Sequence, residues 1–242
     1  MLAGCAVLAG WAFGIAPLRS IVPGLPEMVP NTALLFVLAG VALLSRGDRR
    51  ARVNTVMWAS AFVIVILGML TLAQYLFSLD LRIDGLLLYR SEPVSQDLKF
   101  PGRMSPHTAF NFLLTGCALL LADVEMRRGI RPTEFLALMI ASVSFIALIG
   151  YVYGVTALYG ISPQTGMALH TAATFILLSA GLMLLEPARG LMRVVTGKGL
   201  GGIVARRLLA AAVVVPLALG WLSVLGQRAG FYDELLLHHK GH

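Results

Sequence analysis

Seven stretches of this chain run for at least 18 residues without an aspartate, glutamate, lysine or arginine. A helix of roughly 20 apolar residues can cross the hydrocarbon core of a bilayer, which is about 30 Å thick. Each stretch therefore predicts a transmembrane helix. The predicted helices are Met1–Leu18, Met28–Ser45, Val53–Leu79, Met104–Ala122, Phe135–Gly160, Met167–Leu185 and Leu208–Gln227.

The break between the fifth and sixth helices rests on turn residues, because residues 135–185 contain no charge at all. The sequence GISPQTG at 160–166 supplies those turn residues. Hydrophobic residues make up 58% of the 242 positions and charged residues 13%, with a mean hydropathy of +0.83. These values are far from those of a soluble domain. We expect an all-α integral membrane protein, with a single membrane domain over residues 1–237 and a polar tail at 238–242.

The distribution of basic residues predicts the orientation. In a seven-span chain the loops 46–52, 123–134 and 186–207 share one side, and they hold 12 of the 19 basic but only 5 of the 12 acidic residues. Cytoplasmic loops collect lysine and arginine. We therefore expect a cytoplasmic N-terminus and a periplasmic C-terminus. The positive charge then reflects topology and contact with membrane lipids, and no nucleic-acid partner is expected.

One sequence motif occurs three times, as VPNTALLFVLAGVALL at 29–44, SPHTAFNFLLTGCALL at 105–120 and ALHTAATFILLSAGLM at 168–183. A threonine, a phenylalanine and a small residue recur at i, i+4 and i+8, which places them on one helical stripe. Small residues on such a stripe let helices approach closely in lipid. We expect these positions to pack the inner helices together: Thr32, Phe36 and Gly40; Thr108, Phe112 and Gly116; Thr171, Phe175 and Ser179.

The helices before these motifs also resemble one another, although more weakly. Gly68–Tyr75 aligns with Gly150–Ala157, and Gly10–Gly14 is a distant third copy. The expected repeat unit is a helical hairpin, used at about 1–45, 53–122 and 135–185 and related by an axis along the membrane normal. The middle copy carries an insertion at 80–103, and a seventh helix at about 206–227 is left over.

Polar and aromatic residues gather at the expected outer ends of these helices. The residues just before the repeated threonines are Asn31, His107 and His170, which would ring the axis at one depth. Helix N-termini favour acceptors and anions, and polar residues within a membrane boundary are functional candidates. The candidate ligand-binding set is Asn31, His107, His170, Gln74, Tyr75, Tyr151, Tyr153 and Tyr159.

The same residues also suit ordinary helix ends. Pro30 and Pro106 fit the first helical turn, Ser105 fits a cap, and interfacial tyrosines commonly form aromatic belts. Catalytic signatures are absent from the sequence, so we expect no enzyme and no catalytic residue. No metal-ligand pattern accompanies the histidines, and no cofactor is required by the sequence.

The segments LRSIVPGLPEMVPNTALLFVLAG, FPGRMSPHTAFNFLLTG, GYVYGVTALYG, MALHTAATFILLSAGLMLLEPARG and ARRLLAAAVVVPLALGWLSVLGQRAGFYD follow one another along the chain. Together they resemble the integral-membrane sensory region at the N-terminus of many bacterial hybrid histidine kinases and diguanylate cyclases. The resemblance covers roughly residues 10–233 and implies a location in the bacterial inner membrane. In those sensors the segment resembling Gly226–Asp233 leads into one more span and then to signalling domains. Here LLLHHKGH follows instead, so we expect no cytoplasmic output domain.

Three functions remain open from the sequence. The first is a non-catalytic, membrane-embedded sensory-type module that acts through partner membrane proteins. The second is a structural accessory subunit of a larger photosynthetic or respiratory membrane complex. The third, a small-solute transporter, has less support, because the expected spans contain no charged residue.

Overall fold

The computed structural model describes residues 1–22, 24–46, 51–85, 102–126, 131–160, 166–186, 190–197 and 199–228. Within these ranges the chain forms α-helices and no strands, which confirms the all-α class. Short 3-10 turns lie at Ile83–Gly85 and Thr156–Leu158. The α-helices are α1 (Leu2–Ala12), α2 (Ala16–Arg19), α3 (Pro30–Ser45), α4 (Ala51–Leu76), α5 (Pro106–Leu120), α6 (Pro132–Tyr153), α7 (Leu169–Met183), α8 (Gly190–Thr196) and α9 (Leu200–Arg228).

The described residues do not confirm the seven spans expected from the sequence. Among the described residues, Thr55–Leu76 of α4 and Pro132–Tyr153 of α6 are long and apolar enough to cross a bilayer. The pair formed by α8 and the first part of α9, bent by 97°, would be a third if it acts as one span. Membrane localisation is therefore plausible on length and composition, and seven complete spans are not shown.

The difference arises because the chain leaves the helix before several uncharged runs end. All seven expected segments contain a helix, but the run from Met1 breaks after Ala12 and the run from Phe135 breaks after Tyr153. The helices α3, α5 and α7 contain 16, 15 and 15 residues. A rise of 1.5 Å per residue gives them lengths of about 22–24 Å, less than a typical hydrocarbon core.

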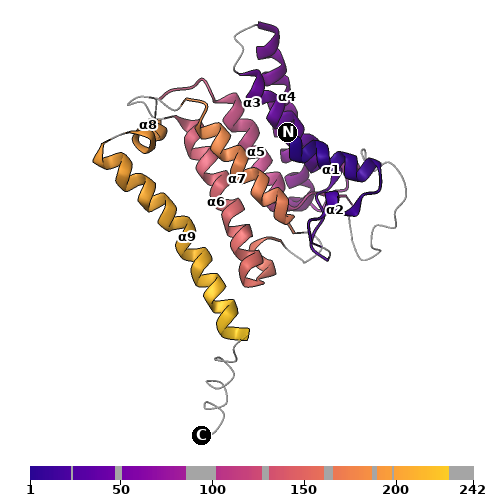
Figure 1. The fold of residues 1–242 in the computed structure, drawn as a ribbon. Coiled ribbons are helices and arrows are strands. Elements are labelled where there is room, and N and C mark those ends of the chain that lie inside the picture. Colours follow the sequence, from indigo (N-terminus) through magenta and orange to yellow (C-terminus); the bar gives the residue numbers. More distant parts are fainter. Residues whose placement is uncertain are drawn as a thin grey trace, which may run out of the picture.

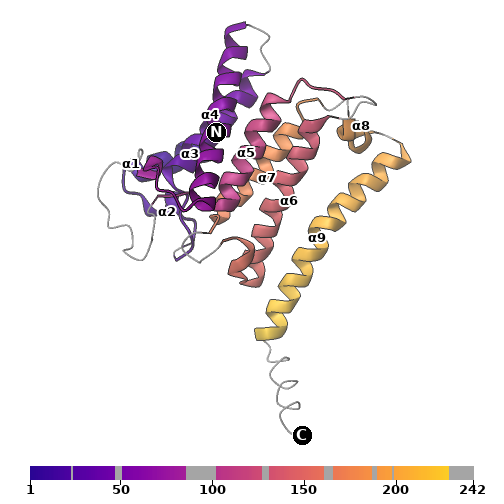
Figure 2. The same ribbon diagram turned by 180° about the vertical axis from the view of Figure 1, so that it is seen from behind.

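The helices associate mainly as consecutive pairs. Extensive contacts join α4 with α5, α6 with α7 and α1 with α3, and α3 also packs against α4. The helices α3, α5 and α7 contact one another as well. Helices α1 and α2 lie on one flank of the molecule and α9 on the opposite flank (Figures 1 and 2). The inner helices that carry the repeated motif therefore meet between the two flanks.

Local sequence explains where these helices start. Pro30, Pro106 and Pro132 each occupy the first turn of a helix, where a missing N–H costs nothing. Ser105 caps α5, because its hydroxyl accepts a hydrogen bond from Thr108 N. The sequence predicted these roles for Ser105 and Pro106, and the structure confirms them.

Glycines bring the paired helices close together. A Cβ atom built on Gly4 of α1 would lie 2.4 Å from Ala33 O of α3, and one on Gly68 of α4 would lie 3.0 Å from Ala109 O of α5. In the other direction, a Cβ on Gly116 of α5 would lie 2.9 Å from Val65 N of α4. Backbone atoms cannot move aside as a flexible side chain can, so glycine is required at these contacts.

We expect Gly116→Ala to destabilise the protein although alanine is the better helix former. The new methyl group would meet the α4 backbone, and such overpacking costs about 1–3 kcal/mol, more than the ~1 kcal/mol gained in helix propensity. Gly181→Ala in α7 is the matched control, because the nearest atom to its new methyl group would be a side-chain atom, Leu43 Cδ1, at 3.4 Å. Unfolding of the detergent-solubilised variants in increasing SDS measures both effects. Equal stability of the two variants would contradict this account of the α4–α5 contact.

Some expectations fall on residues outside the described ranges. These are most of the turn at 160–166, most of the insertion at 80–103, the basic loop positions 47–50 and 127–130, and the polar tail at 238–242.

Candidate functional site

The centre of the molecule is a cluster of three phenylalanine rings, one from each inner helix. The ring centroids of Phe36, Phe112 and Phe175 lie 4.6–4.9 Å apart, with interplanar angles of 57–62°. These are edge-on and tilted contacts of the kind that aromatic rings prefer. None of the three side chains is more than 1% exposed. We call this cluster the phenylalanine triad.

The other positions of the repeated motif lie inside the protein as well. Thr32, Thr108 and Thr171 are at most 2% exposed, and Ser179 is 3% exposed. Gly40 is buried against Met1, and Gly116 against α4. All nine expected packing residues therefore face other parts of the protein.

A second threefold feature lies where the outer helix of each pair ends, and we call it the corner hydrogen bond. Trp11 Nε1 donates to Met28 O at 2.9 Å, Tyr75 Oη to Met104 O at 3.1 Å, and Tyr151 Oη to Met167 O at 2.5 Å. Each methionine precedes its motif threonine by four residues. In each pair, an aromatic side chain at the end of one helix thus holds the segment that leads into the next.

The backbone conformation after each of these three aromatic residues is also repeated. Three residues after the aromatic residue, Gly14, Ser78 and Gly154 adopt positive φ values of 69°, 52° and 69°. The next residue then donates its N–H to a carbonyl five residues back, in Ile15 to Gly10, Leu79 to Gln74 and Val155 to Gly150. The alignment of Gly68–Tyr75 with Gly150–Ala157 is therefore in a different register from the structure, which pairs Tyr75 with Tyr151, whereas the alignment of Gly10–Gly14 already placed Trp11 opposite Tyr151. Glycine spacing guided the first of these alignments, whereas the hydrogen bond to a methionine carbonyl decides the register.

The three residues expected to ring the axis, Asn31, His107 and His170, differ in their hydrogen bonding. All three side chains are half-buried, next to the fully buried threonines. Asn31 Nδ2 donates to Ile83 O at 3.1 Å, so this residue is used to hold the segment after α4. His107 Nδ1 and His170 Nε2 are buried and have no hydrogen-bond partner within the described chain.

Gln74 belongs to a buried polar cluster with two charged residues of the insertion. Arg103 Nε lies 2.8 Å from Asp84 Oδ2, and Gln74 Nε2 donates to the same oxygen at 3.0 Å. Gln74 Oε1 accepts from Leu81 N at 3.0 Å, and the Arg103 guanidinium lies 5.5 Å from the centre of the Tyr75 ring. The insertion was expected to be an outer loop, and its burial of an ion pair was not foreseen. The sequence did not indicate this buried ion pair, because a buried charge and an exposed charge look alike in a sequence.

The remaining tyrosines take different positions. Tyr151 and Tyr159 stack with ring centroids 4.0 Å apart and an interplanar angle of 9°. Tyr153 points instead toward α9, where its hydroxyl donates to Pro216 O at 3.3 Å. Six of the eight candidate ligand-binding residues, all but the two histidines, thus contribute to several separate contacts.

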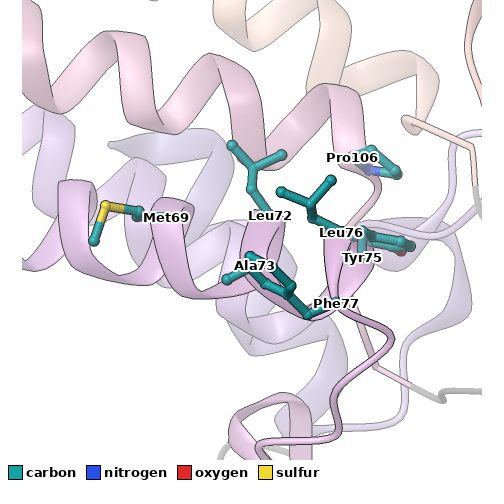
Figure 3. Close-up of a pocket in the computed structure, with 7 residues that line it drawn as sticks. All are labelled: Met69, Leu72, Ala73, Tyr75, Leu76, Phe77 and Pro106. Atoms are coloured by element: carbon teal, nitrogen blue, oxygen red, sulfur yellow. The ribbon is translucent and has the colours of Figure 1, made fainter.

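A groove of about 590 Å³ lies on the outside of the α4–α5 pair (Figure 3). Of the candidate residues, only Tyr75 lines it, and its hydroxyl is already engaged by Met104 O. The rest of the lining is apolar, so the groove suits hydrocarbon rather than a polar ligand. Its lining residues are Met69, Leu72, Ala73, Tyr75, Leu76, Phe77 and Pro106.

Two further buried polar contacts were not foreseen from the sequence. Asn111 Nδ2 donates to Ser144 Oγ at 2.9 Å between α5 and α6. Glu134, 1% exposed, accepts from Leu191 N at 2.8 Å and from Met192 N, and so fixes the start of α8 against α6. A carboxylate at a helix start is favoured by the unpaired N–H groups there, so Glu134 has a clear structural role.

We expect Tyr151→Phe to reduce the free energy of unfolding by about 1 kcal/mol, the usual net contribution of one hydrogen bond. The ring and its stacking on Tyr159 would remain, and only the bond to Met167 O would be lost. Tyr153→Phe, two residues away on the same helix, should change stability less because Tyr153 is 38% exposed and its bond is longer. SDS unfolding curves of both variants in one detergent provide the measurement. Equal losses would argue against a special role for the corner hydrogen bond.

Within the described part of the chain, no group of three or more histidine, cysteine, aspartate or glutamate side chains could hold a metal ion. Comparison of the sequence and structure with family models, curated proteins and solved structures finds no match. The arrangement of the helices is therefore the basis for the function proposed below.

Proposed function

We propose that the chain is a non-catalytic, membrane-embedded module of the sensory type that acts by binding partner membrane proteins. The observation that carries this proposal is the surface of α9. This 29-residue helix lies on the flank of the molecule, and its main contacts are with α6 and α8 (Figures 1 and 2). A helix that is apolar on most of its faces belongs in lipid or against another protein.

The exposed part of α9 is rich in large apolar side chains. Val214, Leu219, Trp221 and Leu222 are 57–63% exposed, and charged residues are confined to the ends of the helix. The beginning of α9 is fixed by Arg206, whose Nη1 donates to Val195 O at 2.6 Å and to Gly197 O at 3.1 Å. A helix fixed at one end with apolar surface along its length is suited to binding a second transmembrane helix.

The interior offers less support for solute transport. The phenylalanine triad fills the space between the three inner helices, and its rings are in mutual contact. A path along the proposed axis would have to displace all three rings. The transporter alternative is therefore the weakest of the three.

We further propose that three helical hairpins are copies of one unit arranged about an axis along the membrane normal. The phenylalanine triad, the three corner hydrogen bonds and the three positive-φ corners support this hypothesis. On this proposal the seven apolar segments lie in the bacterial inner membrane, with the N-terminus in the cytoplasm. Labelling of single cysteines in intact cells tests the orientation: positions 198 and 82 should be accessible from opposite sides.

Site-specific cross-linking tests the proposed partner contact. A photoreactive residue at Trp221 should form adducts with another integral membrane protein, whereas one at Leu177, 73% exposed on α7, should not. A stable complex with large catalytic subunits would favour the accessory-subunit alternative, and a signalling protein would favour the sensory module. Adducts with lipid alone at Trp221 would contradict both.

A further inference from the structure

Arg19, at the end of α2, lies against the first corner hydrogen bond. Its guanidinium carbon is 4.8 Å from the centre of the Trp11 ring, a cation–π contact. Trp11 is held in turn by Met28 O, and Met28 N donates to Arg19 O at 2.9 Å. The Trp11 ring and the Arg19 backbone are therefore both fixed, and the Arg19 guanidinium has a defined position.

The second corner shows what such a guanidinium can bind. Arg103 lies over Tyr75 as Arg19 lies over Trp11, although it comes from a different point in its hairpin. Arg103 Nε donates to the carboxylate of Asp84 at 2.8 Å. At Arg19 the corresponding Nε is buried but has no hydrogen-bond partner among the described residues. One of two similar niches thus contains its anion within the chain, whereas at the other the Arg19 guanidinium has no anion among the described residues.

The surroundings of Arg19 favour a lipid as the source of the anion. Ile15, Leu18, Ile21 and Val22 flank it in the chain and are 36–63% exposed. The nearby Glu27 is exposed and forms no ion pair with Arg19 in the described structure. An arginine fixed among exposed apolar side chains at a helix end matches the boundary between acyl chains and headgroups, where arginine binds phosphate well.

We infer that Arg19 and Trp11 form a binding site for the phosphate of a phospholipid headgroup, with the lipid chains lying along the exposed residues around α2. The phosphate oxygens accept from the guanidinium while Trp11 holds its plane. This inference does not depend on the proposed partner-binding function of α9, which lies on the opposite flank (Figure 1).

Native mass spectrometry of the delipidated full chain with added phosphatidylglycerol tests the site. Arg19→Gln should bind one phosphatidylglycerol fewer than wild type at the same lipid concentration, with an affinity at this site about tenfold weaker, as expected for loss of a charge-assisted hydrogen bond. Arg82→Gln is the matched control, since Arg82 is an exposed arginine in the segment after α4. Arg19→Lys keeps the charge without the planar fork and should fall between wild type and Arg19→Gln. Far-UV circular dichroism checks that each variant is folded.

Three outcomes would overturn the inference. Equal lipid retention by wild type and Arg19→Gln would show that Arg19 does not hold a lipid, whether it binds water or another carboxylate. Inorganic phosphate that displaces the retained lipid from wild type at millimolar concentration would identify a free-phosphate site. Loss of a co-purifying protein from Arg19→Gln, with lipid retention unchanged, would assign Arg19 to a protein interface.

Discussion

Phe112→Ala should cost about 3–5 kcal/mol of unfolding free energy, the range found when a fully buried phenylalanine is truncated in a packed core. The Phe112 ring is 0% exposed and contacts both Phe36 and Phe175, at 4.9 and 4.8 Å. Its removal would leave a cavity where three helices meet and would break two aromatic contacts at once. The measurement is the SDS or thermal unfolding midpoint of the purified protein in a mild detergent.

Phe135→Ala provides the control for this prediction. Phe135 lies on α6 and is 49% exposed, so its truncation should change stability by no more than about 0.5 kcal/mol. Phe36→Ala and Phe175→Ala should resemble Phe112→Ala, because each ring is buried and contacts the other two rings of the triad. A small effect of Phe112→Ala, similar to that of Phe135→Ala, would mean that the triad does not hold the inner helices together.

Asp84→Ala should also be strongly destabilising, at about 3 kcal/mol, because it would remove the buried carboxylate that Arg103 Nε binds and leave only the more exposed Asp80, 3.7 Å from Arg103 Nη2. The side chains of Arg103 and Asp84 are 2% and 7% exposed, so water cannot replace the lost partner easily. Gln74 Nε2 would lose its acceptor in the same change. The expected result is a large fall in the unfolding midpoint, with increased proteolysis near residues 80–85 as a local readout.

The surface pair Arg46–Asp123 is the matched control, since the Asp123 side chain is 72% exposed. Asp123→Ala should cost at most about 1 kcal/mol, as exposed ion pairs generally do. The double variant Asp84→Ala, Arg103→Met should recover part of the stability lost in Asp84→Ala, because it also removes the buried charge that has lost its nearest carboxylate. If Asp84→Ala and Asp123→Ala were equally mild, the buried cluster would not stabilise the insertion.

Two sets of contacts hold the helices in place. The phenylalanine triad joins the three inner helices, whereas the corner hydrogen bonds and the Asp84–Arg103 pair fix the segments that lead into them. The candidate ligand residues Gln74, Tyr75 and Tyr151 belong to the contacts that fix these leading segments. Their hydrogen bonds within the chain give them a structural role that any ligand would have to share.

The sequence by itself determined the helical class and the inward stripe. Uncharged runs located a helix in each of seven segments, and the spacing of four residues placed Phe36, Phe112 and Phe175 on equivalent faces. Both signals are local, because helix periodicity depends on residues a few positions apart. Such signals can be read before any tertiary contact is known.

Only the tertiary structure decided the helix lengths, the corners and the buried charges. Trp11, Tyr75 and Tyr151 bind main-chain oxygens of Met28, Met104 and Met167, and a carbonyl group is present at every residue, so the sequence does not mark the acceptor. The recurring methionine four residues before each threonine was visible, but it gained meaning only from these bonds. Likewise, Asp84 and Arg103 are 19 residues apart in the sequence, and no local pattern marks them as partners. Non-local contacts of this kind are set by the packing of whole helices, which no short pattern encodes.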